Sequence, residues 1–176
     1  ELELTYPMGG ERLFTEQRLP IYFDSNLHLQ DENASVAYSV DNGVSWIEGE
    51  AFNAPYKYWN IPALPLSEVL LRISRSGKTS VSAPIVVSAS IDLAIYSQDP
   101  ETVTFSWNSV EGADHYELLQ LVDDDWVVIE STNTLELITL KDAYTNREDW
   151  FAVRAVNHAA GIRSRRSVAQ LYVPFN

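Results

Sequence analysis

The stretch at residues 102–107, Thr-Val-Thr-Phe-Ser-Trp, alternates polar and apolar side chains with a period of two. Val103, Phe105 and Trp107 therefore share one side of the segment, because successive side chains of a β-strand point to opposite faces. After a glycine-containing turn, a second β-like run follows over residues 115–122. This succession predicts two neighbouring strands of an antiparallel sheet with one face buried.

The strand pattern extends over the whole second half of the chain. Seven short runs of apolar and β-branched residues, separated by turn residues, are strand candidates. They span residues 91–96, 102–107, 115–122, 126–130, 134–140, 150–156 and 167–173. Short strands with turn signals about every ten residues predict an antiparallel sandwich.

Several motifs of this half follow one another in a defined order. They are Thr-Val-Thr-Phe-Ser-Trp at 102–107, Gly-Ala-Asp-His-Tyr-Glu-Leu at 112–118, Leu140, Val-Arg-Ala-Val-Asn at 153–157 and Gly-Ile-Arg-Ser at 161–164. In this order and spacing they resemble a fibronectin type III domain, over roughly residues 90–174. The resemblance implies a seven-strand sandwich with Trp107 and Tyr116 in its core.

One position departs from the pattern of that family. The family usually has a tyrosine four residues before the valine that Val153 matches, where it forms a tyrosine corner. This chain has Asp149 there, with Tyr144 and Trp150 nearby. Either another aromatic side chain substitutes, or the corner is built differently.

The first half is also β-rich, with strand candidates at residues 2–6, 19–23, 35–40, 56–60, 69–74 and 80–87. Glycine- and asparagine-containing turns separate them, and no helical periodicity is present. The segments at 6–11, 37–46 and 58–62 resemble, in order, the Ig-like modules of large secreted bacterial proteins. We therefore expect an all-β chain of two tandem antiparallel β-sandwich domains. Residues 1–88 are expected to be Ig-like and residues 89–176 fibronectin type III-like.

The amino-acid composition limits the classes of molecule that the chain is expected to bind. The chain of 176 residues has 25 acidic and 12 basic side chains, for a formal net charge of −13. A phosphate backbone would be repelled, so we expect no nucleic acid partner.

No apolar run reaches the roughly 18 residues of a membrane span, so no membrane insertion is expected. The sequence contains no cysteine, which excludes disulfides and cysteine-ligated metals. It begins at Glu1, and we expect a piece of a longer protein whose signal sequence is absent.

Residues 39–46, Ser-Val-Asp-Asn-Gly-Val-Ser-Trp, have the spacing S-x-D-x-G-x-[ST]-W. This spacing resembles the Asp-box, a hairpin motif that is repeated around sialidase propellers. The resemblance to an active sialidase would imply several such boxes and six blades, for which the chain has no room. We predict a structural hairpin built from Ser39, Asp41, Gly43, Ser45 and Trp46. Asp41 would accept turn hydrogen bonds, and Trp46 would fold back over the turn.

Aromatic side chains are the candidates for contact with a ligand or partner. In a strand, Tyr56 and Tyr58 share one face and Trp59 takes the other. If the tyrosines point outward, they form a platform on which a sugar ring or a partner stacks. The alternative is that Trp59 packs inward and the tyrosines cover a sheet edge. Trp126 is a third candidate contact.

Asp123, Asp124 and Asp125 are consecutive and lie between two strand candidates. They favour a solvated hairpin tip, with a weak cation site as the alternative because hard cations bind clustered oxygens. The histidines, His28 among them, match no metal-ligand spacing, and no nucleophile or nucleotide-binding motif is present. We therefore predict no catalytic residues, no metal and no cofactor.

These observations favour a non-catalytic spacer or interaction module pair from a larger secreted or cell-surface bacterial protein. It would contact a protein partner or position neighbouring domains of the same polypeptide. The alternative is a carbohydrate-binding accessory module of a secreted glycosidase or protease, with a polysaccharide as its ligand.

Overall fold

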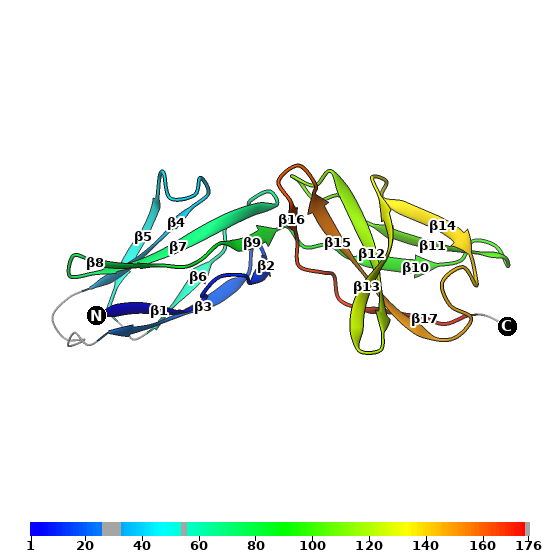
Figure 1. Cartoon of the computed structure of the whole chain (residues 1–176), viewed down its shortest axis with the longest axis horizontal. Helices are drawn as coiled ribbons and strands as arrows, with labels where there is room; N and C mark the ends of the chain where they lie inside the picture. The colour runs from blue at the N-terminus through cyan, green and yellow to red at the C-terminus, as the bar shows by residue number, and fades with distance from the viewer. Residues whose placement is uncertain (26–32, 54–55, 175–176) are drawn as a thin grey trace. The chain divides into compact units, whose positions relative to one another are not determined.

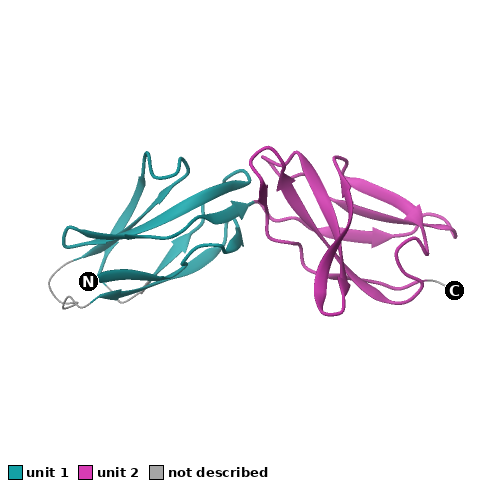
Figure 2. Ribbon diagram, viewed as in Figure 1, with its two compact units in different colours: residues 1–88 teal, residues 89–176 magenta. Residues whose placement is uncertain are grey.

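The computed structural model describes residues 1–25, 33–53 and 56–174, without the side chain of Tyr56. The described residues contain strands and turns but no helix, which confirms the predicted all-β class. They form two compact units, residues 1–88 and residues 89–176 (Figure 2). No helix in the described part of the chain is long and apolar enough to cross a membrane.

The described residues of unit 1 form nine strands, which Figure 1 labels in chain order. They are β1 (Leu2–Tyr6), β2 (Arg12–Phe14), β3 (Arg18–Ser25), β4 (Ala34–Ser39), β5 (Ile47–Phe52), β6 (Tyr56–Asn60), β7 (Ser67–Arg75), β8 (Lys78–Val81) and β9 (Ile85–Ser88). One sheet has the order β1-β3-β6, and the other has β2-β9-β7-β4-β5 with β8 also paired to β7. All pairs are antiparallel except β2 with β9, which run parallel. The Ig-like character of this sandwich stays a prediction.

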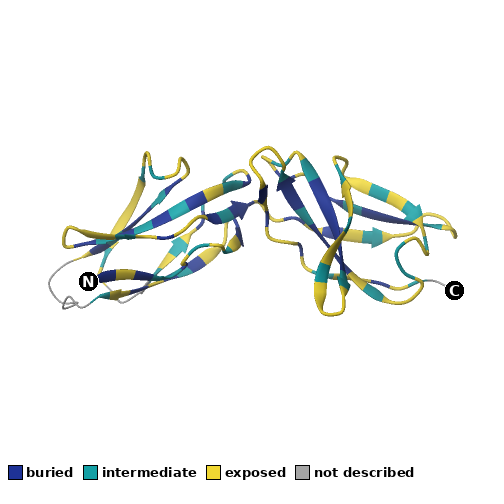
Figure 3. Cartoon of the chain, viewed as in Figure 1, coloured by how far each residue is buried: buried dark blue, intermediate teal, exposed yellow. Residues whose placement is uncertain are grey.

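The core of unit 1 lies between these two sheets. Along β3 the buried residues Leu19, Ile21 and Phe23 alternate with less buried neighbours, as a strand with one covered face requires. Leu71 and Ile85 of the opposite sheet are at most 1% exposed and belong to the same cluster. Figure 3 shows this alternation as bands along the strands.

Unit 2 contains eight strands. They are β10 (Leu93–Tyr96), β11 (Thr102–Trp107), β12 (His115–Val122), β13 (Asp125–Thr132), β14 (Glu136–Leu140), β15 (Asp149–Asn157), β16 (Ile162–Arg163) and β17 (Gln170–Tyr172). The sheet β10-β11-β14 packs against the sheet β13-β12-β15-β16, in which β17 also pairs with β15. Trp107 and Tyr116 are 6% and 5% exposed with ring centroids 6.0 Å apart, as the family resemblance implied.

The last-strand region of each sandwich is irregular in the same way. In unit 1 the predicted strand at 80–87 is interrupted at Ser82, whose Oγ accepts a hydrogen bond from Leu71 N at 3.0 Å. In unit 2 the Oγ of Ser167 accepts one from Val153 N at the same distance. In both places the serine N–H donates back to the carbonyl of the same partner, at 2.8 Å. A buried hydroxyl thus replaces a missing backbone acceptor, so the amides of Leu71 and Val153 are paired.

The corner of unit 2 is closed by a tyrosine from the last strand. Tyr172 donates from its hydroxyl to the carbonyl of Lys141, in the connection between β14 and β15, at 2.9 Å. Tyr144 packs its ring against two core phenylalanines, while Trp150 is 44% exposed. Asp149 accepts a hydrogen bond from the Gln120 side chain. The corner is therefore built differently from the usual pattern, by an aromatic residue remote in the chain.

Candidate functional site

The outer face of the β1-β3-β6 sheet carries the exposed aromatic residues of unit 1. Because Leu19, Ile21 and Phe23 face the core, the alternate residues of β3 face outward: Arg18, Pro20, Tyr22 and Asp24. The strand β3 lies between β1 and β6, so these side chains stand on the centre of the sheet. Tyr22 is 48% exposed.

Two tyrosines of the neighbouring strands lie beside these residues. Tyr6 of β1 is the cross-strand partner of Tyr22 next to a register irregularity, and the two ring centroids are 6.3 Å apart, while the partly buried Tyr6 also packs against the core. Tyr58 of β6 lies opposite Pro20 and is 42% exposed, with the Arg18 guanidinium 3.8 Å from its ring centroid. We call the set Tyr6, Arg18, Tyr22 and Tyr58 the tyrosine face.

The alternatives for residues 56–59 are resolved in part. Trp59 packs against the core and lies 5.6 Å from Tyr38, so it is the inward residue of β6. Tyr58 points to the outer face, where it is exposed. Tyr56 pairs with Tyr22 through the backbone, but its side chain lies outside the described residues. Sequence reasoning missed Tyr22, although the alternation of β3 carries the signal.

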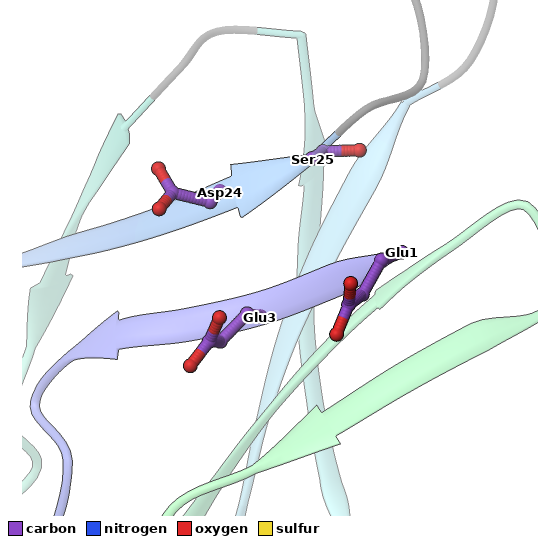
Figure 4. Close-up of a pocket in the computed structure, with 4 residues that line it drawn as sticks. All are labelled: Glu1, Glu3, Asp24 and Ser25. Atoms are coloured by element: carbon purple, nitrogen blue, oxygen red, sulfur yellow. The ribbon is translucent and has the colours of Figure 1, made fainter.

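An open depression borders the tyrosine face at the other end of β1 and β3. It has a volume of about 360 Å³ and is lined by Glu1, Glu3, Asp24 and Ser25. Figure 4 shows Glu1, which precedes β1, and Glu3 of β1 beside Asp24 and Ser25 of β3. Glu3 and Asp24 are cross-strand partners and therefore point to the same face of the sheet.

Trp126 has a different environment from the tyrosines, on the outer face of the β13-β12-β15 layer in unit 2. It is half-buried, and the Arg166 guanidinium lies 4.6 Å from its ring centroid. On the same face, Glu117 accepts hydrogen bonds from Arg154 Nε at 2.8 Å and Arg163 Nε at 3.0 Å. We call these five residues the arginine layer.

The arginine layer covers apolar side chains. Leu119 and Ala152 point to this outer face, yet they are only 1% and 0% exposed. Burial raises the pKa of Glu117, but its hydrogen bonds and charge interactions with the two arginines outweigh burial and lower that pKa below 4.5. Trp126 thus belongs to a sheet of unit 2, whereas Tyr58 belongs to a sheet of unit 1.

The Asp-box-like hairpin joins β4 to β5 through a hydrogen-bonded turn. Asp41 accepts from Ser45 N at 2.8 Å, from the Ser45 hydroxyl at 2.5 Å and from the Ser39 hydroxyl at 2.7 Å. These hydrogen bonds lower the pKa of Asp41 to about 2, and the bond from the Ser45 hydroxyl contributes most. The Ser39 oxygen also accepts from Gly43 N at 2.8 Å.

Trp46 folds back over this turn. A side chain at Gly43, which has a φ of 85°, would contact the Trp46 ring. On its other side the ring carries the Arg72 guanidinium at 4.5 Å, and Arg72 forms an ion pair with Glu48. The motif residues thus bind one another and neighbouring strands, and we retain the structural role as a proposal.

The three consecutive aspartates lie in and beside the tight turn between β12 and β13. Asp123 and Asp124 have φ values of 48° and 68°, and Val122 pairs with Asp125 across the turn. Positive φ at both central residues is typical of a two-residue hairpin turn. All three aspartates are exposed. Among the residues that the structure describes, no three acidic, histidine or cysteine side chains gather as metal ligands.

Two histidines that are distant in sequence meet at one end of unit 2. The rings of His115 and His158 are 5.4 Å apart, and Asp114 bonds His115 Nδ1 at 2.6 Å. Asp114 also accepts the backbone N–H of His158, which is the main cause of its lowered pKa. Sequence spacing could not reveal this pair, because it depends on the β12–β15 register. His28 lies outside the described residues.

Comparisons with known proteins were made for the whole chain. No protein-family model and no curated protein matches the sequence. Among solved structures, "FN3tt mut" is 24% identical over 49% of this chain and 92% of that chain, with a TM-score of 0.39. The chicken CNTN1 FN1-FN3 domains are 13% identical over 96% of this chain and 69% of theirs, with a TM-score of 0.39. The Clostridium thermocellum CbhA fibronectin(III)-like modules are 12% identical over 98% and 93%, with a TM-score of 0.33.

The fold of unit 2 is assigned from its own strand order. A three-stranded sheet of β10, β11 and β14 faces a sheet of β13, β12, β15, β16 and β17. The two sheets form the sandwich that the resemblance of the sequence implied, with Trp107 and Tyr116 in its core. Unit 2 therefore has a fibronectin type III fold.

Proposed function

We propose that the chain is a non-catalytic pair of modules from a larger secreted or cell-surface bacterial protein. Its role is to position neighbouring domains of that protein or to contact a partner through the outer faces of its sheets. A β-sandwich fold alone does not specify a function, so the proposal depends on the surfaces and acidic groups.

The main support for the proposal is the direction in which the pKa values of the acidic side chains shift. The carboxyl groups whose pKa values shift within the described residues are Asp41, Asp99, Asp114 and Glu117, and all four shift downward. Asp41 and Asp99 are lowered first by hydroxyl groups of their own turns, Ser45 and Thr102. A general acid at neutral pH needs a raised pKa, which supports a structural use of these groups.

An activity screen tests the non-catalytic part of this proposal. The purified chain is incubated with chromogenic glycoside, ester and peptide substrates at neutral pH. We expect no turnover above the buffer control. Turnover that co-purifies with the chain and disappears when one of its acidic residues is substituted would overturn the proposal.

The gene region tests the modular part. We expect the open reading frame to continue into further domains and to carry a secretion or anchoring signal. A reading frame that ends at both borders of this chain, in a protein retained in the cytoplasm, would contradict it.

A second candidate function is a carbohydrate-binding accessory module. The specific observation in its favour is the tyrosine face, where Tyr22 and Tyr58 are exposed on a sheet rather than packed in the core. Tyrosine combines a flat apolar ring with a polar hydroxyl, which suits contact with a hydrated sugar.

A further inference from the structure

We propose that the tyrosine face binds a neutral polysaccharide. The Tyr22 ring stacks on the apolar face of one sugar unit, and Glu3 and Asp24 accept hydrogen bonds from hydroxyl groups of the next. This inference deepens the proposed function, since it gives the non-catalytic module a ligand class and a surface.

The stacking surface is held in place by its neighbours. Tyr22 stands on the central strand of the β1-β3-β6 sheet, so its strand is paired with a neighbour on both sides. The Tyr6 ring lies 6.3 Å away at an interplanar angle of 50° and supports the Tyr22 ring from one side. A site on regular strands is positioned more exactly than a site on loops, so little order has to be gained on binding.

The polar groups lie beside the stacking ring. Asp24 follows Tyr22 by two residues on the same outer face of β3, and Glu3 is its cross-strand partner. Both carboxylates line the depression of about 360 Å³ in Figure 4. This volume falls in the range of about 300–1,000 Å³ that is usual for small-ligand sites. Carboxylates are acceptors only, and sugar hydroxyl groups are donors that fit them.

Charge favours a neutral ligand over an anionic one. The acidic residues Glu1, Glu3 and Asp24 border the depression, and Arg18 is stacked on Tyr58 at the other end of the face. The whole chain has a formal charge of −13. Uronic acid or sulfated chains would therefore be repelled, whereas an uncharged chain with many hydroxyl groups would not.

The distribution of apolar side chains favours a glycan over a protein partner. Among the described side chains of β1, β3 and β6, the exposed large apolar residues are Tyr22 and Tyr58. Exposed leucine, isoleucine, valine or phenylalanine side chains on these strands are absent from that described set. Stable protein interfaces usually bury about 800 Å² per partner around an apolar core, whereas a sugar chain needs separate rings with polar groups between them.

Native affinity electrophoresis tests the proposal. The whole chain is run in gels that contain hydroxyethylcellulose, a neutral β-glucan, or polygalacturonate, an anionic chain, and in gels with no polysaccharide. We expect retardation by the neutral glucan and none by polygalacturonate. Tyr22→Ala should weaken the affinity about tenfold, while Tyr22→Phe should retain most of it because the ring remains.

A matched control variant distinguishes binding at the tyrosine face from nonspecific binding through any exposed tyrosine. Tyr96 of unit 2 is 41% exposed, close to the exposed fraction of Tyr58, and Tyr96→Ala should leave the retardation unchanged. Glu3→Gln with Asp24→Asn should weaken binding severalfold, and circular dichroism should show every variant folded. A Tyr22→Ala variant that binds like the wild type would overturn the proposal. So would the absence of retardation by the neutral glucan, the outcome expected if a protein occupies this face. Neither result bears on catalysis, which the substrate screen measures separately.

Discussion

The outer sheet faces of the two units both carry aromatic side chains, but the exposed fraction of these side chains differs. In unit 1, Tyr22 and Tyr58 are 48% and 42% exposed on the tyrosine face. In unit 2, Trp126 is half-buried beneath the Arg166 guanidinium, within the arginine layer. An arginine stacks on an aromatic ring in both units, since Arg18 lies 3.8 Å from the Tyr58 ring centroid, but the tyrosines of unit 1 are the more exposed rings.

This difference in exposure predicts that the arginine layer contributes to the stability of unit 2, whereas the tyrosine face contributes to binding. In unit 2 the outward Leu119 and Ala152 share the face of the arginine layer and are nearly inaccessible. Long charged side chains often shield apolar surface in this way. On the tyrosine face, exposed rings contribute little burial. We therefore expect substitutions in the arginine layer to reduce the free energy of unfolding, and substitutions on the tyrosine face to leave it nearly unchanged.

The largest expected effect is at Glu117, the centre of the arginine layer. Glu117→Ala removes the acceptor of Arg154 and Arg163 and should lower the free energy of unfolding of unit 2 by about 2–3 kcal/mol. Because the folded pKa is depressed, this stabilisation is complete above the ordinary value of 4.5 and is lost as pH falls through the folded pKa.

Urea unfolding at pH 7 and at pH 3, followed by tryptophan fluorescence, measures this effect. Wild type and Glu117→Ala should differ at pH 7 and converge on acidification. An equal difference at both pH values would mean that lost packing, rather than the ion pairs, is responsible.

The next largest effect is expected at Ser82 and Ser167, whose buried hydroxyl groups accept a backbone hydrogen bond in the last-strand region of each unit. Ser167→Ala leaves Val153 N without its acceptor, and Ser82→Ala does the same to Leu71 N. Each change should destabilise its own unit by about 1–2 kcal/mol, because an unpaired buried amide loses its hydration without compensation. Calorimetry should show one altered transition per variant. A shift of both transitions by one substitution would show that the units unfold together.

The sequence pattern predicted the parts of the fold that depend on alternation. Strands with a buried face, such as β11 with Phe105 and Trp107, follow from period-two spacing. The family resemblance implied the sandwich of unit 2 with Trp107 and Tyr116 in its core, but it did not give the order of the strands in each sheet. The strand β5, Ile47–Phe52, was missed because it is mostly exposed and shows no alternation. The short strands β2 and β16 were also missed, since they have three and two residues and depend on pairing with distant partners.

The candidate site was predicted less completely, for a physical reason. Local spacing places Tyr58 opposite Trp59, but it does not show that Tyr22 shares the face of Tyr58. That neighbour relation comes from the β3–β6 register, and the covering of Trp126 by Arg166 comes from the last-strand region of unit 2. Contacts between strands remote in sequence set the exposure of a side chain, and one sequence alone does not contain them.

A matched pair of aromatic substitutions tests the opening comparison directly. Trp126→Ala removes the stacking with Arg166 and part of the cover over the outer face, and should cost about 1 kcal/mol of unfolding free energy. Tyr22→Ala should change stability by less than about 0.5 kcal/mol. Thermal unfolding of both variants gives the values. A larger loss for Tyr22→Ala than for Trp126→Ala would reverse the assignment of the two faces.

A small effect is also expected at Asp41 in the Asp-box-like hairpin, which is exposed but hydrogen-bonded to Ser39 and Ser45. Asp41→Ala should lower the melting temperature of unit 1 by a few degrees at neutral pH and leave unit 2 unchanged. The folded pKa is about 2, below the ordinary 3.8, so the stabilising effect of Asp41 is complete above 3.8 and is lost as pH falls toward 2. Melting curves from pH 7 to pH 2 should therefore converge for wild type and variant. If Asp41→Ala instead abolished binding of the glucan at unchanged stability, the hairpin rather than the tyrosine face would be the ligand site of unit 1.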